Sequence, residues 1–226
     1  MRYVMADIHG QYAMLETMLE EIAFGADDQL FVLGDLTDRG PESLAVIRFL
    51  MRQNNVQVIR GNHDQMILDY FAGKAGARER WMRNGGGVTK EALLALSNSE
   101  RLDILDWLAS LPLYILLDEY ILVHAGLRMR PHTSVTDLLA QQELNDLIWI
   151  REDFYAHPAV PGHKVIFGHT RTPRLWGSNK AEIWYDPVHH DKIGIDCGAH
   201  ALARGGRLAC LCLDDNREFY VPSLVP

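Results

Sequence analysis

Short apolar runs and amphipathic stretches alternate along the first sixty residues of the chain. The apolar run Tyr3–Met5 predicts a strand, and the stretch Gln11–Ala23 repeats its apolar residues with the period of a helix, which Gly25 can end. The same order recurs in a strand at Leu30–Leu33, a helix from Pro41 to about Gln53 and a strand at Val56–Ile59. This alternation is typical of βαβ units and predicts an α/β fold.

The middle and the end of the chain have different patterns. Residues 64–108 are largely helical in pattern, and we expect a helical, cap-like segment over residues 72–110. A hairpin is predicted at Leu113–Leu117 and Tyr120–Val123, followed by a helix over Val135–Leu147. Later strands are predicted at Lys164–Phe167, Ile183–Tyr185, Ile193–Asp196, Leu208–Leu213 and Glu218–Val221. Since no repeat or linker interrupts the pattern, residues 1–226 are expected to form a single domain.

The charge and cysteine content exclude several classes of protein. Lys and Arg number 22 against 30 Asp and Glu, and the net charge of −8 argues against a nucleic-acid partner. The longest apolar run, Leu113–Leu117, is far shorter than the roughly 20 residues of a membrane span, so no membrane partner is expected. Only three cysteines occur, too few for a disulfide framework, which indicates a reducing, cytoplasmic location.

Polar, glycine-marked segments directly follow the predicted strands. Because ligand crevices of open α/β sheets lie outside the carboxyl ends of the strands, these segments should meet at one edge. Their polar side chains combine carboxylate, amide and imidazole groups, a set that suits Mn, Fe or Zn. Six ligands are too many for one ion, so we predict a two-metal site with Asp35 as the bridge. The six are Asp7, His9, Asp35, Asn62, His124 and His169.

The same segments contain groups suited to phosphoryl transfer. Arg39 lies four residues after Asp35, and its planar guanidinium matches phosphate oxygens. His63 directly follows Asn62, a position from which its imidazole can protonate a leaving oxygen. Asp38 is predicted to hold His63 in the donor tautomer.

Other polar residues receive a simpler interpretation. Arg60, next to Gly61, either helps to bind substrate or braces the loop. Cys210 and Cys212 fall on one face of a strand, where core packing is expected. Six histidines outside the motifs are expected to be solvated: His132, His157, His163, His189, His190 and His200.

Together, these segments resemble the phosphoprotein phosphatase branch of the metallophosphoesterases, most closely the small bacterial and bacteriophage-lambda-type Ser/Thr protein phosphatases. The resemblance spans most of the chain and includes Trp81-x-x-Asn84-Gly85-Gly86-Gly87, Trp149-Ile150-Arg151 and Ile195-Asp196-Cys197-Gly198-Ala199. It implies a four-layer arrangement, in which a central β-sandwich of mixed sheets is flanked by helices.

The resemblance also implies how the site is divided. One metal would be held by Asp7, His9 and Asp35, and the other by Asp35, Asn62, His124 and His169. Arg151 resembles the second phosphate-binding arginine of the family, so the expected phosphate-binding residues are Arg39, Arg151 and Asn62. His63 and Asp38 are the expected catalytic pair. Two divalent ions are expected as cofactors, with manganese first and iron or zinc as alternatives.

The activity implied by the resemblance is that of a Ser/Thr protein phosphatase. It would hydrolyse phosphoserine and phosphothreonine monoesters, and phosphotyrosine as a further substrate, by in-line attack of a hydroxide that bridges the metals. An alternative is symmetrical hydrolysis of diadenosine tetraphosphate. Trp176 and Trp184 would then stack an adenine, or else they line a phosphopeptide groove. A further alternative is an inactive phosphate-binding module, although such a module needs neither His63 nor Asp38. Selectivity is expected to come from the cap and from the loops Arg128–Thr136 and Arg171–Asp191.

Overall fold

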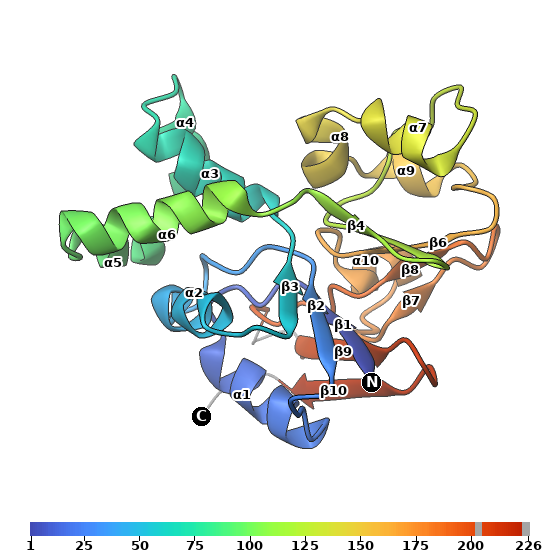
Figure 1. The fold of residues 1–226 in the computed structure, drawn as a ribbon, viewed down its shortest axis with the longest axis horizontal. Coiled ribbons are helices and arrows are strands. Elements are labelled where there is room, and N and C mark those ends of the chain that lie inside the picture. Colours follow the sequence, from blue (N-terminus) through green and yellow to red (C-terminus); the bar gives the residue numbers. More distant parts are fainter. Residues whose placement is uncertain (202–204, 223–226) are drawn as a thin grey trace.

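The first of two mixed sheets contains the amino-terminal strands. In this computed structural model, which describes residues 1–201 and 205–222, its strand order is β10-β9-β1-β2-β3 (Figure 1). Strands β1 (Arg2–Met5), β2 (Gln29–Val32) and β3 (Val56–Val58) run parallel to one another. Strand β9 (Arg207–Cys212) is antiparallel to both β1 and β10 (Glu218–Pro222). The carboxyl ends of β1, β2 and β3 therefore lie at one edge.

The second sheet has the strand order β4-β5-β6-β8-β7. Strands β5 (Tyr120–Val123), β6 (Lys164–Phe167) and β8 (Lys192–Gly194) are parallel at its centre. The short strands β4 (Tyr114–Leu116) and β7 (Trp184–Tyr185) are antiparallel to their neighbours. Antiparallel strands thus occupy the outer positions of this sheet, and its central parallel strands also end together.

The two sheets pack face to face because neighbouring residues of one strand point to opposite faces. In β1, Val4 packs in the cluster between the sheets together with Ile166 of β6, whereas Tyr3 and Met5 pack in a second cluster beneath helices. In β5, Leu122 points between the sheets and Val123 points to a third cluster under other helices. Strands buried on both faces need uninterrupted apolar runs, which explains why these strands do not alternate in polarity.

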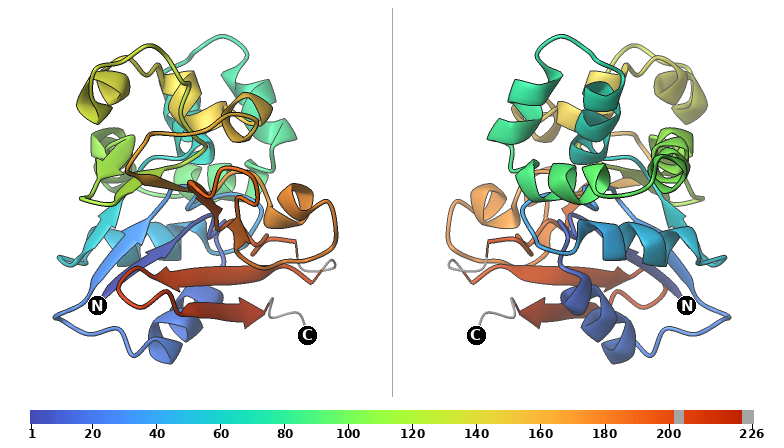
Figure 2. Two further views of the ribbon diagram at one scale, coloured as in Figure 1. Left: turned by 90° about the vertical axis from the view of Figure 1, so that its right-hand side faces the viewer. Right: turned by 90° about the vertical axis from the view of Figure 1, so that its left-hand side faces the viewer.

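Helices cover the outer face of each sheet (Figure 2). Met14 of α1 and Ile47 of α2 cover the first sheet, and Leu138 of α7 and Phe154 of α9 cover the second. Among the described residues, no helix combines the length and apolar character needed to cross a membrane. The helices are α1 (Tyr12–Glu21), α2 (Ser43–Met51), α3 (Asn62–Phe71), α4 (Ala77–Arg83), α5 (Gly87–Leu94), α6 (Asn98–Ser110), α7 (Val135–Ala140), α8 (Leu144–Trp149), α9 (Glu152–Tyr155) and α10 (Thr172–Trp176).

The predicted fold class is confirmed: two mixed sheets pack as a sandwich flanked by helices. The predicted helix over residues 135–147 is wrong as a single element, because Glu143 begins α8 with a capping box to Asp146. Sequence periodicity also missed the short helices α9 and α10. The expected cap segment, residues 72–110, contains α4, α5 and α6, which lie against α3 and α2.

Candidate active site

The predicted site residues lie in loops at the carboxyl ends of five strands. Asp7 and His9 follow β1, Asp35 follows β2, and Asn62 follows β3 as the first residue of α3. His124 and His169 follow β5 and β6 in the second sheet. All six are buried, and they meet where the ends of the two sheets face each other.

Two groups of side chains among the described residues can each hold a metal ion, and they share Asp35. One group contains His9, Asp35 and His63, and the other contains Asp35, His124 and His169. All three residues of the second group are predicted metal ligands. The first contains His63, which we predicted as the proton donor, and neither contains Asp7, whose carboxylate instead accepts the backbone N–H of His169 at 3.0 and 3.1 Å.

Hydrogen bonds from Nδ1 to backbone carbonyls orient the imidazole rings of His9 and His124. Nδ1 of His9 donates to the carbonyl of Thr37 at 2.8 Å, and Nδ1 of His124 donates to that of Leu33 at 2.7 Å. Such bonds place the Nε2 lone pairs toward the centre of the site. Nε2 of His169 is buried and has no hydrogen-bond partner among the described residues.

Burial also keeps these imidazoles neutral, the form that binds metals. Burial, joined by the facing His63 ring and the Arg39 guanidinium, holds the pKa of His9 well below its ordinary value. Burial lowers the pKa values of His124 and His169 as well. Neutral imidazoles that direct Nε2 into the site, with that of His169 lacking any partner among the described residues, fit a divalent metal centre.

Carboxylates crowd the same space. Burial raises the pKa of Asp7 well above its ordinary range, and the charges of Asp196 and Asp35 add to the effect. Burial likewise raises the pKa of Asp196 to about 6. For Asp35, burial opposes ionisation, but the facing histidines outweigh it and lower the pKa. Divalent cations would offset this accumulation of negative charge, so the donor set fits the predicted two-metal centre.

The predicted catalytic pair is in contact. Nδ1 of His63 lies 2.6 Å from Oδ2 of Asp38, and both side chains are buried. Ser43 and Thr89 hydroxyls each lie 3.0 Å from the Asp38 backbone nitrogen and accept from it. The sequence did not assign a role to Trp81, whose indole N–H donates to the Asp38 carboxylate.

Arg39 points into the site. Its guanidinium donates to Nε2 of His9 at 2.8 Å and to Nε2 of His63 at 2.9 Å, and its backbone N–H donates to the carbonyl of Gly85. The ring of His200 lies within 3.4 Å of the same guanidinium and packs edge-on against His9. The expectation that His200 is solvated is wrong, because the chain before β9 folds back over the site, and burial lowers its pKa to about 3.

Arg151 lies at the other side of the site. Its guanidinium donates to the hydroxyl of Thr170 at 3.0 Å, directly after His169. The neighbouring Glu152 pairs with Arg174, and Asp153 pairs with Arg128. The carboxylates next to Arg151 in sequence are therefore engaged elsewhere, which leaves its guanidinium directed toward the site.

Backbone strain is concentrated in these loops. Six predicted site residues have a positive φ, a conformation that non-glycine residues rarely adopt: Asp7 (53°), His9 (47°), Asp35 (50°), Asp38 (71°), Arg39 (68°) and His169 (61°). Close packing accompanies the strain, since a Cβ on Gly168 would lie 2.0 Å from Oδ2 of Asp7. Such conformations persist where surrounding contacts enforce them, and they cluster at functional sites.

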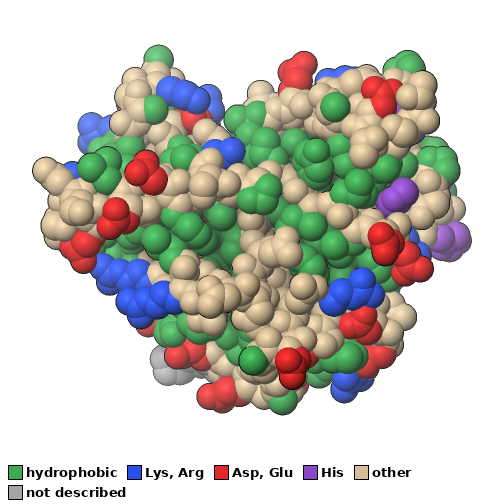
Figure 3. Space-filling view, viewed as in Figure 1, with side chains coloured by type: hydrophobic (Ala, Val, Ile, Leu, Met, Phe, Trp, Pro, Cys, Tyr) green, Lys and Arg blue, Asp and Glu red, His purple; other side chains and the backbone are tan. Residues whose placement is uncertain are grey.

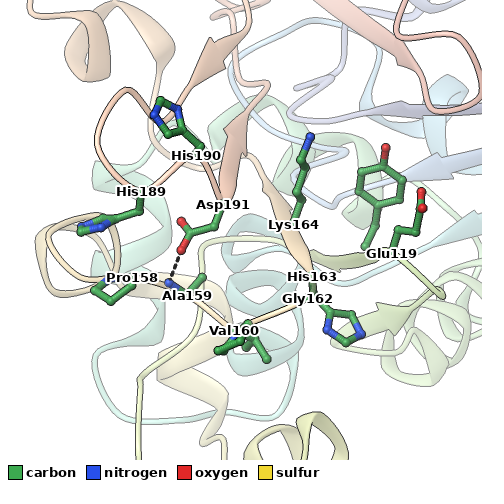
Figure 4. Close-up of a pocket in the computed structure, with 12 residues that line it drawn as sticks. Glu119, Pro158, Ala159, Val160, Gly162, His163, Lys164, His189, His190 and Asp191 are labelled. Atoms are coloured by element: carbon green, nitrogen blue, oxygen red, sulfur yellow. Dashed lines mark hydrogen bonds between the residues drawn. The ribbon is translucent and has the colours of Figure 1, made fainter.

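A separate pocket of about 530 Å³ lies at the amino ends of β5 and β6, away from the carboxyl ends that form the site (Figure 4). Asp191 in its wall accepts the backbone N–H of Ala159 at 2.6 Å. His163, His189 and His190 line it, but they do not form a metal-capable group among residues 1–201 and 205–222. None of the predicted site residues lines this pocket.

Comparisons with known proteins agree on the family and the fold. A sequence profile of calcineurin-like phosphoesterases matches residues 3–205. The symmetrical bis(5'-nucleosyl)-tetraphosphatase of Nitrosomonas europaea is 36% identical over 62% of this chain and 50% of its own length. That of Haemophilus ducreyi is 30% identical over 80% of this chain and 62% of its own length. The chain spans about half the length of most curated relatives it matches.

Solved structures with the same fold include enzymes named for different substrates. A protein provisionally named a diadenosine tetraphosphatase superposes with a TM-score of 0.74 at 22% identity, covering 100% of this chain and 94% of its own. A protein serine/threonine phosphatase from Saccharomyces cerevisiae has a TM-score of 0.68 at 15% identity, covering 100% of this chain and 80% of its own.

The expectation of a Ser/Thr protein phosphatase is wrong, because the curated relatives at 30–38% identity are named for a nucleotide substrate. The motifs that suggested it contain the predicted metal ligands and phosphate-binding residues. Both activities need those groups, so the motifs do not distinguish a phosphoprotein from a dinucleotide.

Proposed function

Since this chain belongs to the calcineurin-like phosphoesterase family, we propose that it is a two-metal hydrolase that cleaves dinucleoside tetraphosphates symmetrically. The observation that carries the catalytic part is the pair of metal-capable groups sharing Asp35, with Arg39 and Arg151 beside them. The nucleotide part is supported by the names of the curated relatives.

The proposed reaction breaks the central P–O–P linkage of the substrate. Water adds to one inner phosphorus, the bond from that phosphorus to the central bridging oxygen breaks, and two nucleoside diphosphates leave. Two divalent ions held by the shared-carboxylate groups would activate water at neutral pH and neutralise charge on the phosphoryl oxygens. We propose manganese, because the mixed carboxylate and imidazole set suits it.

The two arginines are proposed to bind the phosphates. The Arg39 guanidinium already faces the histidines of the site, and Thr170 fixes that of Arg151. Planar guanidinium groups bind phosphate oxygens through two parallel hydrogen bonds, and positioned cations stabilise the charge that spreads over the transferred group. Asn62, whose Oδ1 lies 2.8 Å from Nε2 of His124, is proposed as a metal ligand that also borders the phosphate.

His63 is proposed to protonate the leaving oxygen. Its Nδ1–H donates to Asp38, and Nε2 accepts from Arg39. A buried carboxylate stabilises the protonated ring, which can then donate from Nε2 once Arg39 has turned to the substrate phosphate. Asp38 is thus proposed to orient the proton donor.

Product analysis tests the proposal directly. Protein reconstituted with Mn is incubated with diadenosine tetraphosphate, with a phosphoserine peptide and p-nitrophenyl phosphate in parallel. ADP as the single nucleotide product is the expected result. AMP together with ATP would contradict symmetrical cleavage, and faster turnover of the peptide would contradict the nucleotide assignment.

A further inference from the structure

A groove of about 570 Å³ opens between helix α4 of the cap and helix α8. The two helices face one another across the molecule in Figure 1, and the surface is hollowed between them in Figure 3. Arg80 and Asn84 form one wall, and Asn145, Asp146 and Trp149 form the other, with Arg128 beside them. Grooves of this size are typical of sites for small organic ligands.

Both walls of the groove continue into the candidate active site. Asn84 directly precedes Gly85, whose carbonyl accepts the backbone N–H of Arg39 at 3.2 Å. On the opposite wall, the ring of Trp149 lies edge-on to that of His169, with centroids 5.9 Å apart and planes at 88°. A substrate whose phosphate lies between the two phosphate-binding arginines can therefore extend into this groove.

Trp149 provides a fixed aromatic surface. It is half-buried and packs against two hydrophobic clusters, one beneath the cap and one beneath α7 to α9. The tryptophans suggested by the sequence are less suited to stacking. Trp184 is only 6% exposed within the core, and the ammonium of Lys180 lies 4.3 Å from the ring centroid of Trp176. Trp149 is thus the better stacking surface near the predicted metal ligands.

The polar groups of the groove suit a nucleotide. Carboxylates of Asp146 and Asp153 already neutralise Arg128, whereas Arg80 is exposed and has no ion-pair partner among the described residues. Asn84 donates through Nδ2 to the carbonyl of Arg80. Its side-chain carbonyl, together with the exposed amide of Asn145, can pair with the edge of a base.

We propose that this groove binds one nucleoside diphosphate half of the substrate. The base stacks on Trp149, and the phosphates lie between Arg80 and Arg151. A flat aromatic surface, an amide pair and one uncompensated cation match the three parts of a nucleotide, the base face, the base edge and the phosphate. This inference rests on the proposed function and identifies the part of the chain that selects its substrate.

Substitutions on each wall test the groove. Trp149→Leu, Trp149→Phe and Arg80→Ala are compared with Arg83→Ala, which removes the same charge from an exposed position of the same helix. The readout is kcat/KM for diadenosine tetraphosphate divided by kcat/KM for p-nitrophenyl phosphate. Loss of stacking should lower this ratio about tenfold in Trp149→Leu, mainly through KM, and less in Trp149→Phe. Arg80→Ala should also lower it, and Arg83→Ala should leave it unchanged.

Inhibition by ADP provides a second readout. ADP should compete with p-nitrophenyl phosphate, and its inhibition constant should rise about tenfold in Trp149→Leu. Unchanged ratios and unchanged ADP inhibition in both Trp149→Leu and Arg80→Ala would overturn the groove assignment while leaving the proposed function intact. No cleavage of diadenosine tetraphosphate by the unsubstituted protein would overturn the proposed function, and the groove assignment with it.

Discussion

The indole N–H of Trp81 donates to both carboxylate oxygens of Asp38, with N···O distances of 3.1 and 2.9 Å. Trp81 lies on α4 in the cap and is fully buried. A Cβ on Gly86 would lie 2.2 Å from its indole nitrogen, so the glycine-rich turn after α4 packs directly against this ring. The cap is therefore joined to the predicted catalytic pair by a hydrogen bond.

Replacing Trp81 with Phe should keep the aromatic packing and remove this donor. A buried carboxylate that loses a hydrogen bond is destabilised by about 1–3 kcal/mol, so we expect a similar loss in the free energy of unfolding. Since Asp38 is proposed to orient His63, kcat should also fall, by roughly tenfold. Urea denaturation and steady-state kinetics measure the two effects. The matched control is Trp107→Phe on α6, and equal kcat values in the two variants would show that the Trp81 hydrogen bond does not orient the pair.

Asp35 belongs to both metal-capable groups, so Asp35→Asn should weaken the binding of both ions. His169 belongs to only one, and His169→Ala should weaken one ion and leave the other bound. Loss of an outer partner commonly costs about 10–100-fold in metal affinity, and loss of a ligand should cost more. Manganese content after dialysis, measured by inductively coupled plasma mass spectrometry, checks this, with the distant His190→Ala as control. One fully retained ion in Asp35→Asn would exclude a bridging role.

Much of the fold and part of the site could be predicted because they follow from local pattern. The parallel pairing of β1 with β2 brings Asp7 and His9 beside Asp35 through strand ends alone. The contact of Trp81 with Asp38 joins residues 43 positions apart and depends on how the cap folds back. Neither apolar period nor motif spacing encodes that path.

The position of His200 in the site could not be predicted from the sequence either. It follows Gly198 and Ala199 in a turn before β9, and no periodic pattern marks it. Its contacts with Arg39 and His9 exist because the chain returns over strand ends more than 160 residues earlier. The protein phosphatase expectation was wrong for a different reason, since the metal-binding and phosphate-binding roles predicted for these residues are common to the hydrolysis of many phosphoesters.

The buried ion pair of Lys192 and Asp186 should make stability depend on pH. Burial opposes ionisation of Asp186, but hydrogen bonds from Lys192 and from two backbone N–H groups outweigh it and hold its pKa below the ordinary 3.8. A carboxyl with a lowered folded-state pKa stabilises the protein above its unfolded pKa, and this contribution is lost as the pH falls through the folded value.

Asp186→Asn should therefore lower the free energy of unfolding at pH 7 by about 1–3 kcal/mol. The difference from the unsubstituted protein should begin to shrink below about pH 4, where the carboxyl of the unfolded chain takes up a proton, and should be lost as the pH falls through the lower folded-state pKa. Urea titrations at pH 7, 4 and 3 measure both quantities, and the exposed Asp103→Asn serves as control. A difference that does not change with pH would mean that the pair does not titrate as proposed.

His63 can act either as a proton donor or as a metal ligand, and the geometry allows a test between them. Its Nδ1 lies 2.6 Å from Asp38, as a proton donor requires, yet its Nε2 lies 4.0 Å from Oδ2 of Asp35 within a metal-capable group. If His63 donates a proton, His63→Asn should lower kcat for phenyl phosphate, whose leaving oxygen is strongly basic, by about 10²–10⁴-fold without changing manganese content.

The identity of the leaving group sharpens this test. A leaving oxygen that is stable as an anion needs no proton, so the loss in His63→Asn should be small with p-nitrophenyl phosphate and large with phenyl phosphate. A ligand role predicts a different pattern: kcat falls by the same factor with both substrates, and the manganese content also falls. Because a proton donor acts only on the departing oxygen, a loss that depends on the leaving group assigns that role to His63 even if its removal also shifts Arg39.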